Sequence, residues 1–83
     1  MDLKKLLETG KLRKHGTYEQ TGIMCADLHK ISGTAGSDVN YAYIYPDGKI
    51  EIITEKNNHY GYGHFGDDGN IHDDSNRAVF EII

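Results

Sequence analysis

The residue types that can do chemistry gather near the C-terminal end of the sequence. Three histidines, His59, His64 and His72, are interleaved there with tyrosines and aspartates. Imidazole and carboxylate groups together can hold Zn²⁺ or Mn²⁺, and two histidines can act as general acid and base in RNA cleavage. These residues therefore suggest one hypothesis, a small histidine-dependent ribonuclease or metal-dependent hydrolase centred on the three histidines.

The spacing of these groups does not favour that hypothesis. The intervals between the histidines match none of the common metal motifs, and the aspartate-rich segment 67–74 lacks the alternating oxygen ligands and the closing glutamate of a calcium loop. A metal-independent ribonuclease also needs a cation beside the reacting phosphate, and only Lys56 and Arg77 lie nearby in the sequence. We therefore expect no metal and no other cofactor, and an enzyme is the less favoured alternative.

Tyrosine is the more informative residue type in this chain. Six tyrosines occur in 83 residues, and most of them fall within residues 41–62. Tyrosine offers a large contact area at low entropic cost and keeps a hydroxyl for hydrogen bonding, which explains its enrichment in protein interfaces. With the nearby aspartates, the tyrosines predict an acidic and aromatic binding surface. Its expected members are Tyr41, Tyr43, Tyr45, Tyr60, Tyr62, Asp67, Asp68, Asp73 and Asp74. The alternative is that the tyrosines lie beneath a helix and cover the second face of a sheet.

The charge distribution indicates the kind of partner. The net charge is -4, and because residues 1–14 are basic, the rest of the chain is more acidic than the total suggests. An acidic body repels nucleic-acid phosphates and attracts basic surfaces. We therefore expect a protein partner with a basic surface, no direct binding to duplex DNA and no membrane partner. The leading hypothesis is a non-catalytic protein-binding module that covers a basic surface, such as one that normally holds nucleic acid.

In length and charge the chain resembles, in a general way, the small inhibitors that phages make against host defence complexes, such as anti-CRISPR proteins. The resemblance rests on a short, acidic chain without catalytic motifs, and no motif of this sequence carries it. It implies an inhibitor of a nucleic-acid-handling complex.

Length and composition limit the domain organisation. A chain of 83 residues can bury one small core, so we expect a single domain over residues 1–83. The single cysteine, Cys25, cannot form an internal disulfide, and the sequence shows neither an apolar run of transmembrane length nor a signal peptide. These features predict a cytoplasmic protein.

Local sequence signals predict the elements that position these residues. Pro46-Asp47-Gly48 separates two apolar runs and predicts a hairpin with strands over 41–45 and 49–53, with the aliphatic side chains facing the core and the tyrosines facing out. Residues 2–9 read as a short helix capped by Asp2, and the spacing of Met24, Leu28 and Ile31 predicts a second helix over about 18–32. Segments 59–65 and 77–83 read as strands, and segments 32–38 and 66–76 read as loops.

These elements predict an α+β fold, with one or two N-terminal helices packed on a small, mainly antiparallel sheet of three to four strands. The alternative is a mostly β fold in which residues 18–28 form a strand. The expected core contains Leu6, Leu28, Ile44, Ile52 and Phe80.

Overall fold

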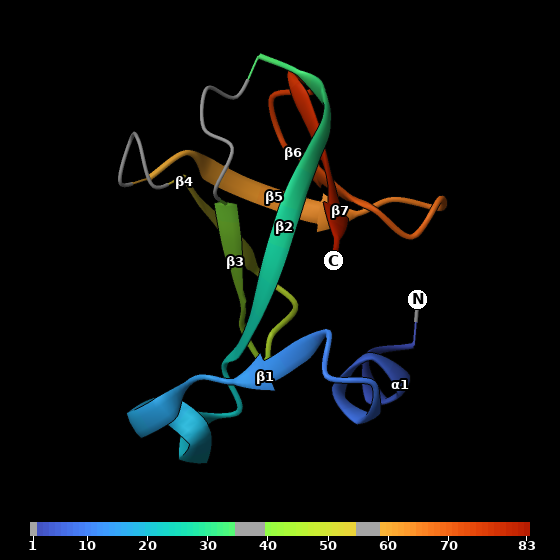
Figure 1. The fold of residues 1–83 in the computed structure, drawn as a ribbon. Coiled ribbons are helices and arrows are strands. Elements are labelled where there is room, and N and C mark those ends of the chain that lie inside the picture. The colour runs from blue at the N-terminus through green and yellow to red at the C-terminus, as the bar shows by residue number, and fades with distance from the viewer. Residues whose placement is uncertain (1, 35–39, 55–58) are drawn as a thin grey trace.

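A computed structural model describes residues 2–34, 40–54 and 59–83 of the chain. One short helix is followed almost entirely by β structure (Figure 1). The elements in chain order are α1 (Leu3–Glu8), β1 (Leu12–Lys14), the 3-10 helix η1 (Gly16–Thr21), β2 (Met24–Gly33), β3 (Asn40–Ile44), β4 (Ile50–Thr54), β5 (Gly61–Phe65), β6 (Ile71–Asp73) and β7 (Ala78–Ile82).

Strands β2 to β7 form a closed antiparallel barrel. Each strand pairs with the next one in the chain, and β7 returns to pair with β2. The closure is possible because β2 is long: Met24–Leu28 pairs with β3, and the part from Leu28 to Gly33 pairs with β7. The extra strand β1 pairs with the start of β2, on the edge that β7 occupies further along. In Figure 1, β2 crosses in front of β5, which lies on the opposite wall, and α1 and β1 lie at one end of the barrel.

The structure contradicts the α+β prediction, because the predicted helix over 18–32 is absent. Residues 16–21 form the 3-10 helix, and the following residues form β2. The apparent helical spacing of Met24, Leu28 and Ile31 is misleading, because the side chains alternate: Ala26 and Leu28 are buried in the barrel, and Ile31 is exposed. Gly22 lies between η1 and β2 and has a φ of 74°, a conformation that glycine adopts readily and that ends the helical turn. The mostly β alternative matches the observed class, although its strand begins at Met24.

The predictions made from local signals at the N-terminus and in the hairpin are confirmed. Helix α1 begins after Asp2, whose carboxylate accepts a hydrogen bond of 3.3 Å from the backbone N–H of Lys5. Strands β3 and β4 pair in the predicted register, and Gly48 has the positive φ, 91°, that their turn requires. The side chains of Ala42, Ile44, Ile50 and Ile52 point into the barrel, whereas Ile53 lies with the tyrosines on the outer side.

The barrel interior is filled by inward side chains of β2 to β7. Four of the five predicted core residues are buried, and Leu6 is the exception, because the leucines of α1 are partly buried where the helix packs against the core. The prediction of a loop over 66–76 is wrong in part, because this segment contains β6, whose Ile71 is fully buried. The predicted strand over 77–83 is confirmed as β7. Of the predicted loop over 32–38, Ser32 and Gly33 end β2 and residues 35–39 lie outside the described residues.

Gly63 lies where the barrel wall has no room for a side chain. A Cβ atom added there would lie 2.7 Å from the carbonyl oxygen of His72 and 2.8 Å from Cδ1 of Ile52. We predict that Gly63→Ala lowers the free energy of unfolding by about 1–3 kcal/mol, because β5 must move away from β6. The control is Gly16→Ala, since a Cβ atom on Gly16 would meet nothing within 4 Å. Urea unfolding of the two variants measures the difference, and equal stabilities would contradict the prediction.

Candidate binding face

A row of outward side chains crosses the middle of the barrel wall. Tyr43 on β3 is the register partner of Glu51 on β4, and Glu51 is the partner of Tyr62 on β5. Side chains at paired positions lie on the same face of a sheet, so these three are neighbours outside the barrel. Tyr41 packs edge to face on Tyr43, with ring centroids 5.5 Å apart. We call Tyr41, Tyr43, Tyr45, Glu51 and Tyr62 the tyrosine face.

Glu51 is the centre of the contacts within this face. One carboxylate oxygen accepts a hydrogen bond of 3.1 Å from the hydroxyl of Tyr45, and the other lies 3.3 Å from Nε2 of His59. Lys49 places its ammonium group 4.5 Å from the ring centroid of Tyr62 and 5.6 Å from that of Tyr45. Burial, and then the hydrogen bond to Glu51, raise the pKa of Tyr45, which keeps this phenol protonated. The face therefore combines aromatic rings with one carboxylate, and the ammonium group of Lys49 lies over two of the rings.

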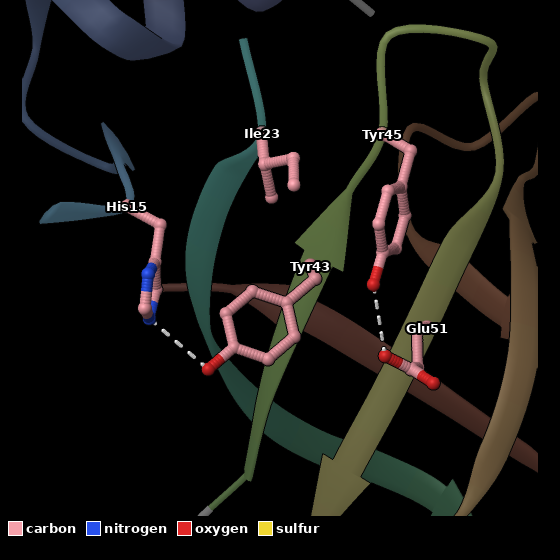
Figure 2. Close-up of a pocket in the computed structure, with 5 residues that line it drawn as sticks. All are labelled: His15, Ile23, Tyr43, Tyr45 and Glu51. Atoms are coloured by element: carbon pink, nitrogen blue, oxygen red, sulfur yellow. Dashed lines mark hydrogen bonds between the residues drawn. The ribbon is translucent and has the colours of Figure 1, made fainter. Parts of the chain in front are cut away.

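A cavity of about 400 Å³ opens beside Glu51 (Figure 2). His15 and Tyr43 form one side of it, joined by a contact of 3.1 Å between the tyrosine hydroxyl and Nε2 of the histidine. Tyr45 and Glu51 form the other side, and Ile23 lies between the two sides in the view. Segments that are distant in sequence thus meet at one hollow, because β1 and η1 bring His15 next to β3.

A second hollow, of about 490 Å³, lies across the pair of His15 and Tyr43. Arg13 and Asp27 line it and form an ion pair with an N to O distance of 2.7 Å. The hydrogen bond between these two side chains raises the pKa of Arg13 and lowers the pKa of Asp27. Both side chains are more than half exposed, so solvent screens the pair and it stabilises the fold little.

The structure brings together four of the five tyrosines predicted to form a binding surface. Tyr60 lies apart from them: it precedes β5, is half-buried, and packs its ring edge on the buried Phe80 with centroids 5.9 Å apart. Sequence reasoning missed His15 and Glu51, because nothing in the sequence showed that His15 would meet Tyr43 or that Glu51 would lie among the tyrosines.

The aspartates predicted for the same surface have mostly structural roles. Asp73 is buried, and its carboxylate accepts hydrogen bonds from the backbone N–H groups of Ser75, Arg77 and Ala78 and from the Ser75 hydroxyl. Asp68 contacts His72 at 3.0 Å, and Asp74 contacts His64 at 2.9 Å. Asp67 is exposed.

The three histidines of the enzyme hypothesis do not share one set of contacts. His64 and His72 stack with ring centroids 5.8 Å apart, and each binds its own aspartate. His59 instead contacts Glu51 and packs on the ring of Tyr62, with centroids 5.9 Å apart. Within residues 2–34, 40–54 and 59–83, no group of three or more His, Cys, Asp and Glu side chains is arranged to hold a metal ion.

Comparison with protein-family models, with curated proteins and with solved structures found no match to this chain. Over the described part of the chain, no helix has the length and apolar character needed to cross a membrane.

Asp73 makes stability depend on pH in a defined direction. Burial by itself raises the pKa of this carboxyl, but the hydrogen bonds from Ser75, Arg77 and Ala78 outweigh it, so the pKa lies below its ordinary value of 3.8. A carboxyl with a lowered folded-state pKa stabilises the fold above its unfolded-state pKa, and this contribution is lost as pH falls through the folded-state pKa. We predict that Asp73→Asn lowers the unfolding free energy by about 1–3 kcal/mol at pH 7, because the amide nitrogen faces backbone donors.

The comparison with wild type gives the measurement. The stability difference between wild type and Asp73→Asn should shrink when urea unfolding is repeated below pH 3.8. Asp67→Asn removes the same charge at an exposed position and should change little. A difference for Asp73→Asn that stays constant with pH would show that the ionised carboxylate is not what stabilises this turn.

Proposed function

We propose that the chain is a non-catalytic protein-binding module that docks through the tyrosine face onto a partner with a basic surface. The observation that carries this proposal is the gathering of four tyrosines from β3, the turn after it and β5 around Glu51 of β4, next to a hollow that Glu51 lines. Tyrosine and a central hollow are typical of the energetically dominant part of a protein interface.

The alternative role for the tyrosines, as cover beneath a helix, has no support in the described chain. Helix α1 lies at the end of the barrel, beside β1, and its leucines pack against the core (Figure 1). Tyr62 is 46% exposed, which makes it one of the exposed large side chains of the described chain. The described elements therefore leave the tyrosine face partly open to solvent, with Tyr62 exposed and its other members half-buried.

A basic partner fits the charge of the molecule and of this face. The net charge is -4, and Glu51 lies in the middle of the tyrosines. Asp74 lies beside the same face, because its backbone N–H donates a hydrogen bond of 2.9 Å to the carbonyl oxygen of Tyr62. Complementary charge speeds association and selects the partner, whereas buried aromatic side chains slow dissociation.

Tyr62→Ala tests the tyrosine face, and Ile31→Ala is its matched control, because the two side chains are 46% and 48% exposed. A partner captured from a lysate of the source cells, identified by mass spectrometry and purified, is measured against the wild type and both variants by biolayer interferometry. We predict that Tyr62→Ala weakens binding by about tenfold or more through faster dissociation, because an aromatic anchor is lost. Ile31→Ala should bind as the wild type does.

Three results would overturn the proposal. The first is that no protein with a basic surface is retained at low salt. The second is that both variants bind with wild-type affinity. The third is that the protein cleaves RNA and loses this activity in His64→Ala and His72→Ala, which would favour the enzyme hypothesis.

A further inference from the structure

The carboxylate of Glu51 is largely covered, and within residues 2–34, 40–54 and 59–83 no permanently charged group forms an ion pair with it. Its side chain is 23% exposed, and among the described residues its ion-pair partner is His59, an imidazole that carries charge only when protonated. Its other oxygen is bound by the neutral hydroxyl of Tyr45. A carboxylate withdrawn from water is costly unless a cation meets it. The cavity that Glu51 lines offers space for such a cation.

The walls of this cavity suit a cation with a flat, weakly hydrated head group. The rings of Tyr43 and Tyr45 line it together with Glu51, and aromatic faces attract cations (Figure 2). Its volume of about 400 Å³ is near the lower end of the range of roughly 300–1,000 Å³ for ligand pockets, so a single side chain suits it better than a large ligand.

The molecule already holds one cation on the same group of side chains. The ammonium of Lys49 lies over the rings of Tyr62 and Tyr45, and Lys49 is not among the described residues that line the cavity. The rings next to Glu51 therefore accept a positive charge in this fold.

We propose that this cavity is a subsite for one arginine side chain of the partner protein, with the guanidinium bound to Glu51 and stacked on the rings of Tyr43 and Tyr45. The inference rests on the proposed function and names the partner group that the tyrosine face recognises. Arginine is favoured over lysine because guanidinium is planar, stacks on aromatic rings, is more weakly hydrated than ammonium and can bind carboxylate through two N–H groups.

The subsite is tested without knowing the partner, by NMR titration with N-acetyl-arginine N-methylamide. The matched probe is the citrulline derivative, which has nearly the same shape and no charge. The arginine derivative should shift the aromatic signals of His15, Tyr43 and Tyr45 with a Kd on the order of 1 mM or weaker, as expected for so small a ligand. The citrulline derivative should shift them at least about tenfold less at equal concentration, because it lacks the charge that Glu51 binds.

Glu51→Gln and Glu81→Gln complete the test. Both variants remove one negative charge, but Glu81 lies on β7 and is exposed, whereas Gln at position 51 keeps an oxygen that can accept the hydrogen bond from Tyr45. Glu51→Gln should abolish the shifts caused by the arginine derivative, and Glu81→Gln should preserve them. Equal shifts from arginine and citrulline, or unchanged binding in Glu51→Gln, would overturn the subsite.

The same variants separate this inference from the proposed function. If Tyr62→Ala weakens partner binding but Glu51→Gln does not, and the arginine derivative leaves the three rings unshifted, the arginine subsite is wrong and the protein-binding function stands. If the arginine derivative binds in a manner that depends on Glu51 but no protein partner requires Tyr62, the subsite is supported and the proposed function falls.

Discussion

The pairing of β2 with both β3 and β7 is the constraint on which the rest of the structure depends. This ten-residue strand pairs with β3 along one edge and with β1 and then β7 along the other, and its register with β7 shifts between Lys30 and Ser32. Gly33 then passes so close to the backbone of Arg77 that an added Cβ atom would lie 1.8 Å from its carbonyl oxygen. Closure also limits the interior, because a barrel of six strands is narrow. Small side chains accordingly occupy part of the inner wall, namely Ala26, Ala42, Gly63 and Ala78.

Closure also decides which residues are available for binding. In a closed sheet the inner face is the core, so every alternate residue of β3, β4 and β5 must face outward. The tyrosines of β3 consequently lie beside Glu51 and Tyr62, and the strand outside the barrel, β1, brings His15 to their edge. The tyrosine face is thus a consequence of register: a shift of one residue between β3 and β4 would place Ile52 beside Tyr43 and remove Glu51 from it.

The acidic residues show why charge in a sequence is a poor guide to charge on a surface. Four aspartates occur within residues 67–74, yet Asp73 satisfies backbone donors in the turn before β7 and is 1% exposed. Asp68 and Asp74 each bind a histidine of β6 or β5. Short polar side chains favour such local hydrogen bonds in turns. Glu51, by contrast, lies on a strand away from the aspartate-rich segment, lines a cavity and has a histidine as its ion-pair partner among the described residues.

The sequence by itself determined the features that depend on neighbouring residues. Asp2 caps α1, Pro46-Asp47-Gly48 sets the turn between β3 and β4, and the alternation along this hairpin assigns its core and tyrosine sides, because caps, turns and alternation act over a few residues. Only the tertiary structure decided that residues 24–33 are a strand, that Ile71 belongs to a strand and that His15 meets Tyr43. Those outcomes depend on hydrogen bonds between strands far apart in the chain, and for β2 the gain from pairing with β1, β3 and β7 outweighed a local spacing that resembled a helix.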